Sequence, residues 1–507
     1  MKKEIRSLLR SKAYLVILLA SAIAAYAYGI THSAIDIDDT AIPLYFQQGL
    51  APYVHRWTLF TFFHLFHIPV DFQYTALVDG ISILFLCCSV TVWCSLWKWL
   101  LDRYVQLQPF LYGLVAAVFI TNPIITEVFI YFLHNGICIA YGFTGLALYF
   151  FLAATGQKGR KRILSLAGAT VLLALAVGCY ESFLLVFVMG AFLAFILIHG
   201  FLGEEEGKDG FPVGKVAVWF FHGVIVAAGT LLIRVLMYHV CKLMYDPGVF
   251  EEYDVTYRAI FGDNFTALSE LGMTLKRYIS AYHLAGMMYL PVALLVLSRI
   301  VILCTGLYAA FARKKITVFF ATAVLLFLPP FMAVFEGTVT KFRSAQYIPM
   351  LSAFAVLLAM AFLFRHFGEK KRLPGYLLLV AGLVLVILQC AEMNKWFSVN
   401  YQKHEWARET MMGIAEDLKN GDYDLSKPIV IFGNAEVPVE IASRGAISYN
   451  SGAFRIISML TDPIDPHWKE KCYRSYGYVY DPTPGESILA WGMDAFNHTD
   501  EQLIKLW

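Results

Sequence analysis

Residues 14–30, YLVILLASAIAAYAYGI, form an uncharged apolar stretch, and Asp36-Ile37-Asp38-Asp39 follows shortly after it. With help from its flanks, such a stretch is long enough to cross a hydrocarbon core of roughly 30 Å as an α-helix. Carboxylates inside a membrane are costly, so acids that follow a membrane helix are expected at the surface that the helix reaches. We therefore expect Asp36, Asp38 and Asp39 at the far membrane surface.

The composition places the whole chain in the polytopic membrane class. Of its 507 residues, 59% are hydrophobic, 16% are aromatic and 15% are charged, and the mean hydropathy is +0.61. The basic residues are segregated along the chain and form no continuous patch, so the formal net charge of +2 gives no indication of a nucleic-acid partner. The expected surroundings are a lipid bilayer.

Apolar runs predict about eleven transmembrane helices. They lie near residues 14–30, 75–97, 107–121, 136–154, 163–178, 182–202, 214–240, 286–312, 316–335, 347–364 and 376–391. Lys and Arg concentrate in alternate loops, beginning with Lys2 to Lys12, so the positive-inside rule places the N-terminus in the cytoplasm. An odd number of spans then places the C-terminus outside the cytoplasm.

Two regions are expected from these patterns. Residues 1–391 form the transmembrane region, with a first external loop at 31–74, and residues 392–507 form an extracytoplasmic C-terminal domain. In the tail, Trp406–Lys419 has helical periodicity, and Pro428–Gly433 has the pattern of a buried strand that ends at a glycine. The tail is therefore predicted to be a small α/β lobe.

The carboxylates of the first loop admit two interpretations. Asp39 could simply cap a short interfacial helix, because aspartate accepts hydrogen bonds from the first free N–H groups of a helix. Alternatively, Asp36, Asp38 or Asp39 acts as a catalytic base on an acceptor hydroxyl, and neighbouring acids raise one another's pKa toward the working range. A cap and a base can coexist in this loop.

Cations on the same external face are candidates for binding a phosphate. His55 and Arg56 close the first loop, and Lys341 and Arg343 lie in a later external loop. Arginine can bind a phosphate in a bidentate manner, although snorkelling at the interface is the alternative for any one cation. For Arg234, which lies within a span, a buried pairing or a lipid contact is favoured over catalysis.

Two further external turns carry acids and tyrosines that could contact a substrate or could be satisfied internally. The residues are Glu127, Tyr131, Tyr180 and Glu181. The histidines near the first loop match no zinc-ligand spacing, so no metal site is expected.

Several short motifs follow one another in chain order: Asp38-Asp39, Arg56-Trp57, Asn122-Pro123 with Glu127 and Tyr131, Tyr180 with Ser182, and Arg343 before Pro349. In this order they resemble a known family, the bacterial Gtr-type (GtrII-like) glucosyltransferases that decorate O-antigen and related surface polysaccharides. Glu181 departs from the pattern, because a glutamine is usual after the tyrosine.

The resemblance implies a GT-C-like glycosyltransferase in a bacterial plasma membrane. The implied donor is a polyprenyl-phosphate-linked (undecaprenyl-phosphate-linked) hexose, with glucose as the sugar that the family name gives. The implied acceptor is an external glycan. A base in the first loop implies inverting transfer. Cations suffice to neutralise a lipid monophosphate, so no cofactor is required and a divalent cation (Mg or Mn) is optional.

Two other function classes stay open at the level of the sequence. A transporter or flippase for a lipid-linked sugar would favour charged, broken helices near the bilayer midplane and internal repeats. A polysaccharide polymerase or ligase would also use large external loops and arginines, but would place its chemistry in later loops.

Overall fold

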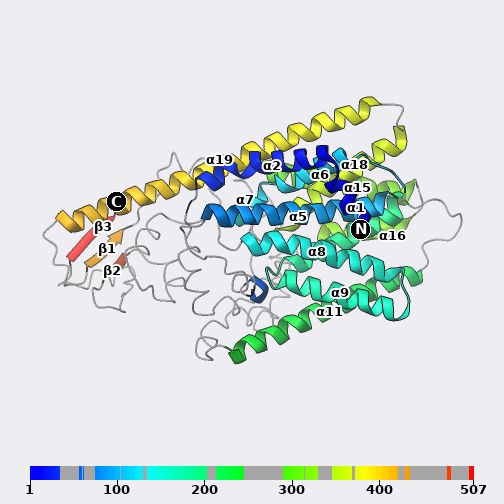
Figure 1. Ribbon diagram of the computed structural model, residues 1–507, viewed down its shortest axis with the longest axis horizontal. Coiled ribbons are helices and arrows are strands. Elements are labelled where there is room, and N and C mark those ends of the chain that lie inside the picture. Colours follow the sequence, from blue (N-terminus) through cyan, green and yellow to red (C-terminus); the bar gives the residue numbers. More distant parts are fainter. Residues whose placement is uncertain are drawn as a thin grey trace. The chain divides into compact units, whose positions relative to one another are not determined.

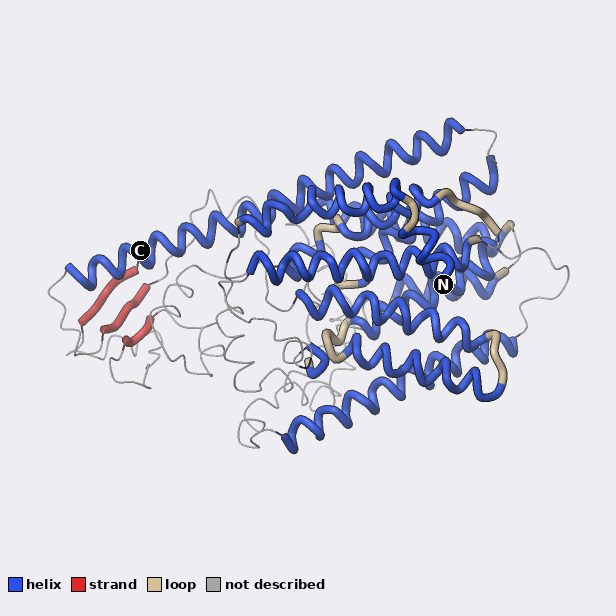
Figure 2. The backbone as a smooth tube through the Cα atoms, viewed as in Figure 1, coloured by secondary structure: helices blue, strands red, loops and turns tan. Residues whose placement is uncertain are grey.

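The computed structural model describes eleven apolar helices, several shorter helical segments and three strands (Figure 1, Figure 2). The described residues are 1–32, 34, 56–59, 61, 75–102, 104–129, 134–202, 213–244, 289–312, 315–328, 345–367, 372–420, 429–433, 477–480 and 502–506. The chain divides into two compact units, one comprising Met1–Thr31 and Tyr45–Asn394 and the other His32–Leu44 and Lys395–Trp507. The domain boundary expected from the sequence, at 391/392, stays a prediction.

Each predicted apolar run contains a helix. In chain order they are α2 (Lys12–Thr31), α5 (Thr75–Leu101), α6 (Pro109–Ile120), α8 (His134–Thr155), α9 (Gly159–Val177), α10 (Phe183–Phe195) with the π-helix η2 (Ile196–Leu202), α11 (Val213–Met244), α15 (Tyr289–Phe311), α16 (Ile316–Phe327), α18 (Tyr347–Phe367) and α19 (Arg372–Asn420). Two short helices, α1 (Lys2–Leu9) and α7 (Ile124–Phe129), join them.

Within the described part of the chain, seven helices are long and apolar enough to cross a membrane. These are α2, α5, α8, α11, α15, α18 and α19, whereas α6, α10 and α16 are shorter apolar helices. The chain is thus a polytopic helical membrane protein. The helix predicted at 406–419 is present, but it continues the last apolar run within α19, because residues 392–406 contain no glycine or proline that would end the helix.

The core of the first unit forms around α6, which is apolar on every side. Every residue of α6 from Leu111 to Ile120 is buried, as expected of a helix without a polar face. It contacts α2, α18 and α5, while α5 packs on α8 and α8 packs on α9. Hydrogen bonds fix α5 against α8: Ser89 Oγ donates to the carbonyl of Cys138 at 2.6 Å and Trp93 Nε1 donates to that of Tyr141 at 2.9 Å.

The helices of the first unit run back and forth, so the ends of consecutive described helices alternate between two opposite ends of the unit (Figure 1). We call the end that contains α7 and the turn between α9 and α10 (Gly178–Ser182) the site end. We call the end that contains α1 and the turn before α9 (Gly156–Lys158) the basic end. With a rise of 1.5 Å per residue, the 19 residues of α9 separate these ends by about 28 Å.

The second unit contains a three-stranded sheet in the order β2-β1-β3. The strands are β1 (Ile429–Gly433), β2 (Gly477–Tyr480) and β3 (Gln502–Leu506). β1 pairs antiparallel with β2, with Ile429 opposite Tyr480, and parallel with β3, with Ile429 opposite Gln502. β1 lies within the segment predicted to form a strand, Pro428–Gly433, and its continuous apolar run suits the central position in the sheet.

Candidate functional site

The candidate site lies at the site end, around the turn that joins α9 to α10. α9 stops at Gly178, whose N–H donates to the carbonyl of Ala174 at 2.8 Å. Tyr180 and Ser182 follow, both buried, and α10 begins at Phe183. Ser182 stands at the N-cap position of α10, yet its hydroxyl oxygen is buried and has no hydrogen-bond partner among the described residues. This turn places polar groups at the mouth of an otherwise apolar helix bundle.

The end of the first loop docks directly on this turn. The N–H of Thr58 donates to the carbonyl of Gly178 at 3.1 Å. A Cβ at Gly178 would collide with Thr58 Oγ1 and would lie 2.7 Å from Trp57 Nε1. Only glycine allows the two segments to approach this closely, so Gly178 fixes the position of residues 56–58 against the bundle.

Arg56 extends from this docked segment over the ring of Tyr180. Its guanidinium carbon lies 5.1 Å from the ring centroid, a cation–π contact. Arg56 Nε is buried and has no hydrogen-bond partner within the described ranges, and the same holds for Trp57 Nε1. Because a buried donor without a partner costs free energy, this arrangement favours an external acceptor such as a phosphate or a sugar oxygen.

Glu181 holds the same turn against α11. One of its carboxylate oxygens lies 3.6 Å from a terminal guanidinium nitrogen of Arg234, and both side chains are more than half buried. Of the two alternatives expected for Arg234, a pairing and a lipid contact, the structure shows the pairing. It also accounts for an acid at position 181, because a neutral amide there would remove the anion that pairs with Arg234 among the described residues.

A second turn at the site end joins α6 to α7. Asn122 is fully buried, and its Oδ1 accepts a hydrogen bond from the N–H of Ile124 at 3.2 Å, which caps the first turn of α7. Glu127 lies on α7, but its side chain is outside the described residues, as is Tyr131. Asn122 Nδ2 is buried without a partner among the groups that the structure describes.

The start of α18 is anchored by a contact that the sequence did not suggest. Tyr141 Oη donates to Gln346 at both the side-chain Oε1, 2.6 Å away, and the backbone carbonyl, 2.8 Å away. Both residues are buried. Gln346 comes shortly after Lys341 and Arg343 in sequence, so Tyr141 fixes the point at which that loop enters the bundle. A polar residue immediately before an apolar run was the only sequence signal for this contact.

The predicted site residues differ in what the structure shows of them. It brings Arg56 and Tyr180 together, and it pairs Glu181, the residue after Tyr180, with Arg234. The backbone of Glu127 is described in α7, but its side chain is not. The predicted residues outside the described part of the chain are Asp36, Asp38, Asp39, His55, Tyr131, Lys341 and Arg343. Among the described side chains, no three His, Cys, Asp or Glu residues are grouped so that they could hold a metal ion.

Comparison with known proteins connects this arrangement to a family. No curated protein matches the chain. The family model described as "Glucosyl transferase GtrII" matches residues 27–364, which include the helical region with Arg56, Tyr180 and Glu181. Because the match covers more than half of the chain, the family is established: the chain belongs to the GtrII glucosyl transferase family.

Proposed function

We propose that this glucosyltransferase moves a hexose, glucose in the first instance, from a polyprenyl-phosphate donor to a cell-surface glycan outside the cytoplasm. The observation that carries the proposal is Arg56, which is held over Tyr180 with a buried Nε that lacks a described partner. A guanidinium positioned in this way can bind a phosphate that leaves with negative charge. Membership in the glucosyl transferase family supports glucose as the sugar that is transferred.

Stabilisation of the leaving group is assigned to the cations of the external face. Arg56 binds the donor phosphate, and Arg343, Lys341 and His55 contribute further positive charge. As the bond between the anomeric carbon and the phosphate oxygen breaks, the electron pair stays on the polyprenyl phosphate, and these cations stabilise that charge. This set neutralises a monophosphate without a metal, so Mg or Mn is optional.

The base is assigned to the first loop. Asp38 or Asp39 takes the proton of the acceptor hydroxyl while the acceptor oxygen attacks the anomeric carbon, and Asp36 orients the pair. One displacement with one base inverts the configuration at that carbon. A retaining route would need a nucleophile and a second acid on opposite sides of the bond.

The sugar is assigned to the polar groups of the two turns at the site end. Tyr180 presents an aromatic ring beside Arg56, and Glu127, Tyr131 and Glu181 supply oxygens for sugar hydroxyls. The C-terminal domain, with its many aromatic side chains, is assigned to acceptor recognition, since aromatic rings stack on sugar rings.

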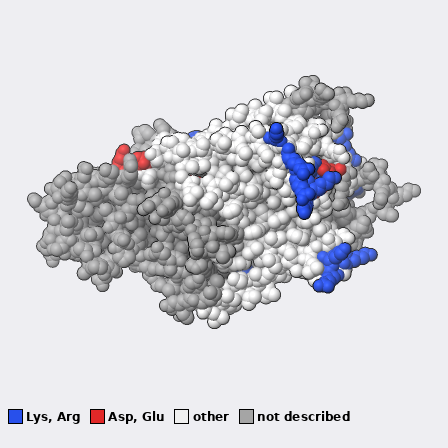
Figure 3. All heavy atoms as spheres, viewed as in Figure 1, with Lys and Arg blue, Asp and Glu red and all other residues white. Residues whose placement is uncertain are grey.

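The proposed orientation is an N-terminus in the cytoplasm and a C-terminus outside it, in a bacterial plasma membrane. The gathering of Lys and Arg over α1 and the start of α9 supports this orientation (Figure 3), because positively charged loops stay in the cytoplasm. Arg56 and Tyr180 then lie on the outer side, at the other end of α9, about 28 Å from the basic end.

The proposal is tested by incubating the purified full-length protein with a panel of radiolabelled polyprenyl-phosphate sugars and an extracted surface glycan. We expect label to move from the glucose donor to the glycan. Movement of intact donor across proteoliposome membranes, without cleavage, would instead support a flippase. Transfer of label from none of the polyprenyl-phosphate sugars would contradict the proposed donor.

A further inference from the structure

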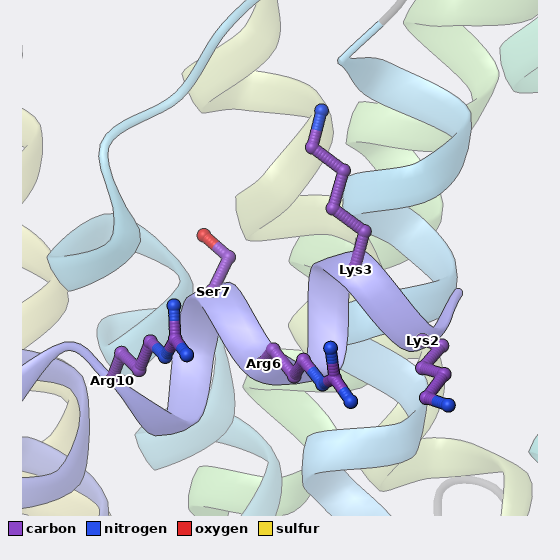
Figure 4. A pocket seen from close by; sticks show the side chains of 5 residues that line it. All are labelled: Lys2, Lys3, Arg6, Ser7 and Arg10. Carbon is purple, nitrogen blue, oxygen red and sulfur yellow. The ribbon is translucent and has the colours of Figure 1, made fainter.

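α1 presents a stripe of cations at the basic end, far from the candidate site. Lys2, Arg6 and Arg10 are spaced four residues apart, so they project from one side of the helix. Together with Lys3 and Ser7 they line an open hollow of about 530 Å³ (Figure 4). The four cations are exposed. We call the three cations on one side of the helix, Lys2, Arg6 and Arg10, the α1 stripe.

The stripe is held in place by the protein itself. The opposite side of α1 carries Leu8, which is fully buried, and α1 contacts α5, α2 and α6. At the corner before α2, Ser11 Oγ accepts a hydrogen bond from the N–H of Tyr14 at 3.3 Å, and the N–H of Ser11 donates to the carbonyl of Leu8 at 3.0 Å. α1 is therefore docked on the bundle rather than free to rotate.

The position of the stripe matches the headgroup layer of a bilayer. α2, which starts at Lys12, is one of the helices able to cross a membrane. The α1 stripe therefore lies where this span enters the membrane surface. The one acid of α1, Glu4, pairs with the amino group of Met1 at 2.6 Å, so it does not neutralise the stripe.

We propose that the α1 stripe binds the phosphate headgroup of an anionic phospholipid and thereby anchors the start of α2. Charge complementarity identifies the occupant, because cations adjacent to a span attract anionic lipid. Arg6 and Arg10 face the same hollow and can bind one phosphate from two sides, and the Ser7 hydroxyl can add a hydrogen bond.

The start of α9 provides a matched control with the same charge. Arg160 and Lys161 are exposed at the same end of the bundle, but adjacent residues on a helix project in different directions and do not converge on one headgroup. Arg162, next to them, donates its Nε–H to the carbonyl of Gln157 at 2.8 Å. Replacing Arg160 and Lys161 removes as much charge as replacing Arg6 and Arg10.

The experiment measures the binding of fluorescent phosphatidylglycerol and phosphatidylcholine to the full-length protein in detergent. We expect phosphatidylglycerol to bind at least about tenfold more tightly, and Arg6→Gln with Arg10→Gln to remove at least about tenfold of that affinity. Arg6→Lys with Arg10→Lys should keep binding within about threefold, because the charge stays. Arg160→Gln with Lys161→Gln should change it by less than about twofold.

Three results would overturn the proposal. Equal losses in the two glutamine double variants would mean that overall charge, and not the stripe, attracts the lipid. Equal binding of the two lipids would exclude headgroup selection. Complete displacement of bound lipid by millimolar inorganic phosphate would indicate a site for the free anion, with no contribution from the lipid.

Discussion

At the scale of single residues, Arg56 is the described side chain that we propose to bind the donor phosphate. Charge-assisted hydrogen bonds of this kind contribute roughly 1.5–3 kcal/mol, so Arg56→Ala should weaken donor binding by about tenfold or more. Arg56→Lys should restore only part of the affinity. A lysine keeps the charge but lacks the planar guanidinium, which lies over the Tyr180 ring and can donate two parallel hydrogen bonds to a phosphate. Titration of the purified protein with a non-transferable polyprenyl-phosphate sugar measures both variants.

Arg160→Ala is the control for Arg56, since it removes an exposed arginine at the opposite end of the bundle. It should leave donor affinity unchanged. If Arg56→Ala and Arg160→Ala had the same affinity as the unmodified protein, Arg56 would have no part in donor binding.

Gly178 sets the distance between the first loop and the bundle. Gly178→Ala places a methyl group against Trp57 and Thr58, and overpacking of this kind costs about 1–3 kcal/mol. We expect a lower midpoint of thermal unfolding in detergent and a loss of transfer activity. Gly80→Ala is the matched change, because a Cβ at that helical position meets nothing within 4 Å, and it should be neutral or slightly stabilising. Equal midpoints for the two variants would show that the close approach at Gly178 is not required.

At the scale of elements, the Glu181–Arg234 pair connects the α9–α10 turn to α11. Because Glu181 is partly exposed, we expect only a modest coupling free energy, about 0.5–1.5 kcal/mol. A double-mutant cycle with Glu181→Gln, Arg234→Gln and the double variant measures it from thermal or denaturant unfolding. Additive single changes would mean that the pair does not hold the turn to α11.

The elements themselves were largely predictable, whereas their contacts were not. Every apolar run became a helix, because a bilayer forces a spanning chain to satisfy its backbone hydrogen bonds internally. The continuity of α19 was not predicted: a span at 376–391 and a helical segment at Trp406–Lys419 were expected separately, although no glycine or proline lies between them. Contacts such as Thr121 Oγ1 to Gln389 Oε1, 2.8 Å apart, join residues distant in sequence, and local patterns carry no information about such pairs.

The sequence could predict which candidate residues lie on the same external face, because the order of spans and loops determines this. Arg56 and Tyr180 were expected on one external face because of the topology, and the structure brings them into contact. The anchor formed by Tyr141 and Gln346 was not expected, because a tyrosine in an apolar run and a glutamine before one have no special spacing. How deep a side chain lies in the bundle, and which neighbour it faces, depend on how the helices pack. Local sequence patterns do not encode this packing.

At the scale of the whole molecule, the separation of charge between the two ends predicts the orientation in the membrane. In a cysteine-free background, Gly421→Cys should react with an impermeant thiol reagent in intact cells, because the C-terminal domain is expected outside. Arg160→Cys, at the basic end, should react only after the cells are permeabilised. Labelling of both positions from the same side would contradict the proposed topology.

The central claim is that an aspartate of the first loop is the base of an outward-facing glucosyl transfer, and the transfer rates of Asp38→Asn, Asp39→Asn and the double variant test it most directly. Asparagine keeps the shape and caps a helix about as well as aspartate, but it cannot take a proton. If one of them is the base, its asparagine variant should lose on the order of 10²- to 10⁴-fold in rate, while expression and donor binding persist. Near-normal transfer by all three variants would contradict the claim.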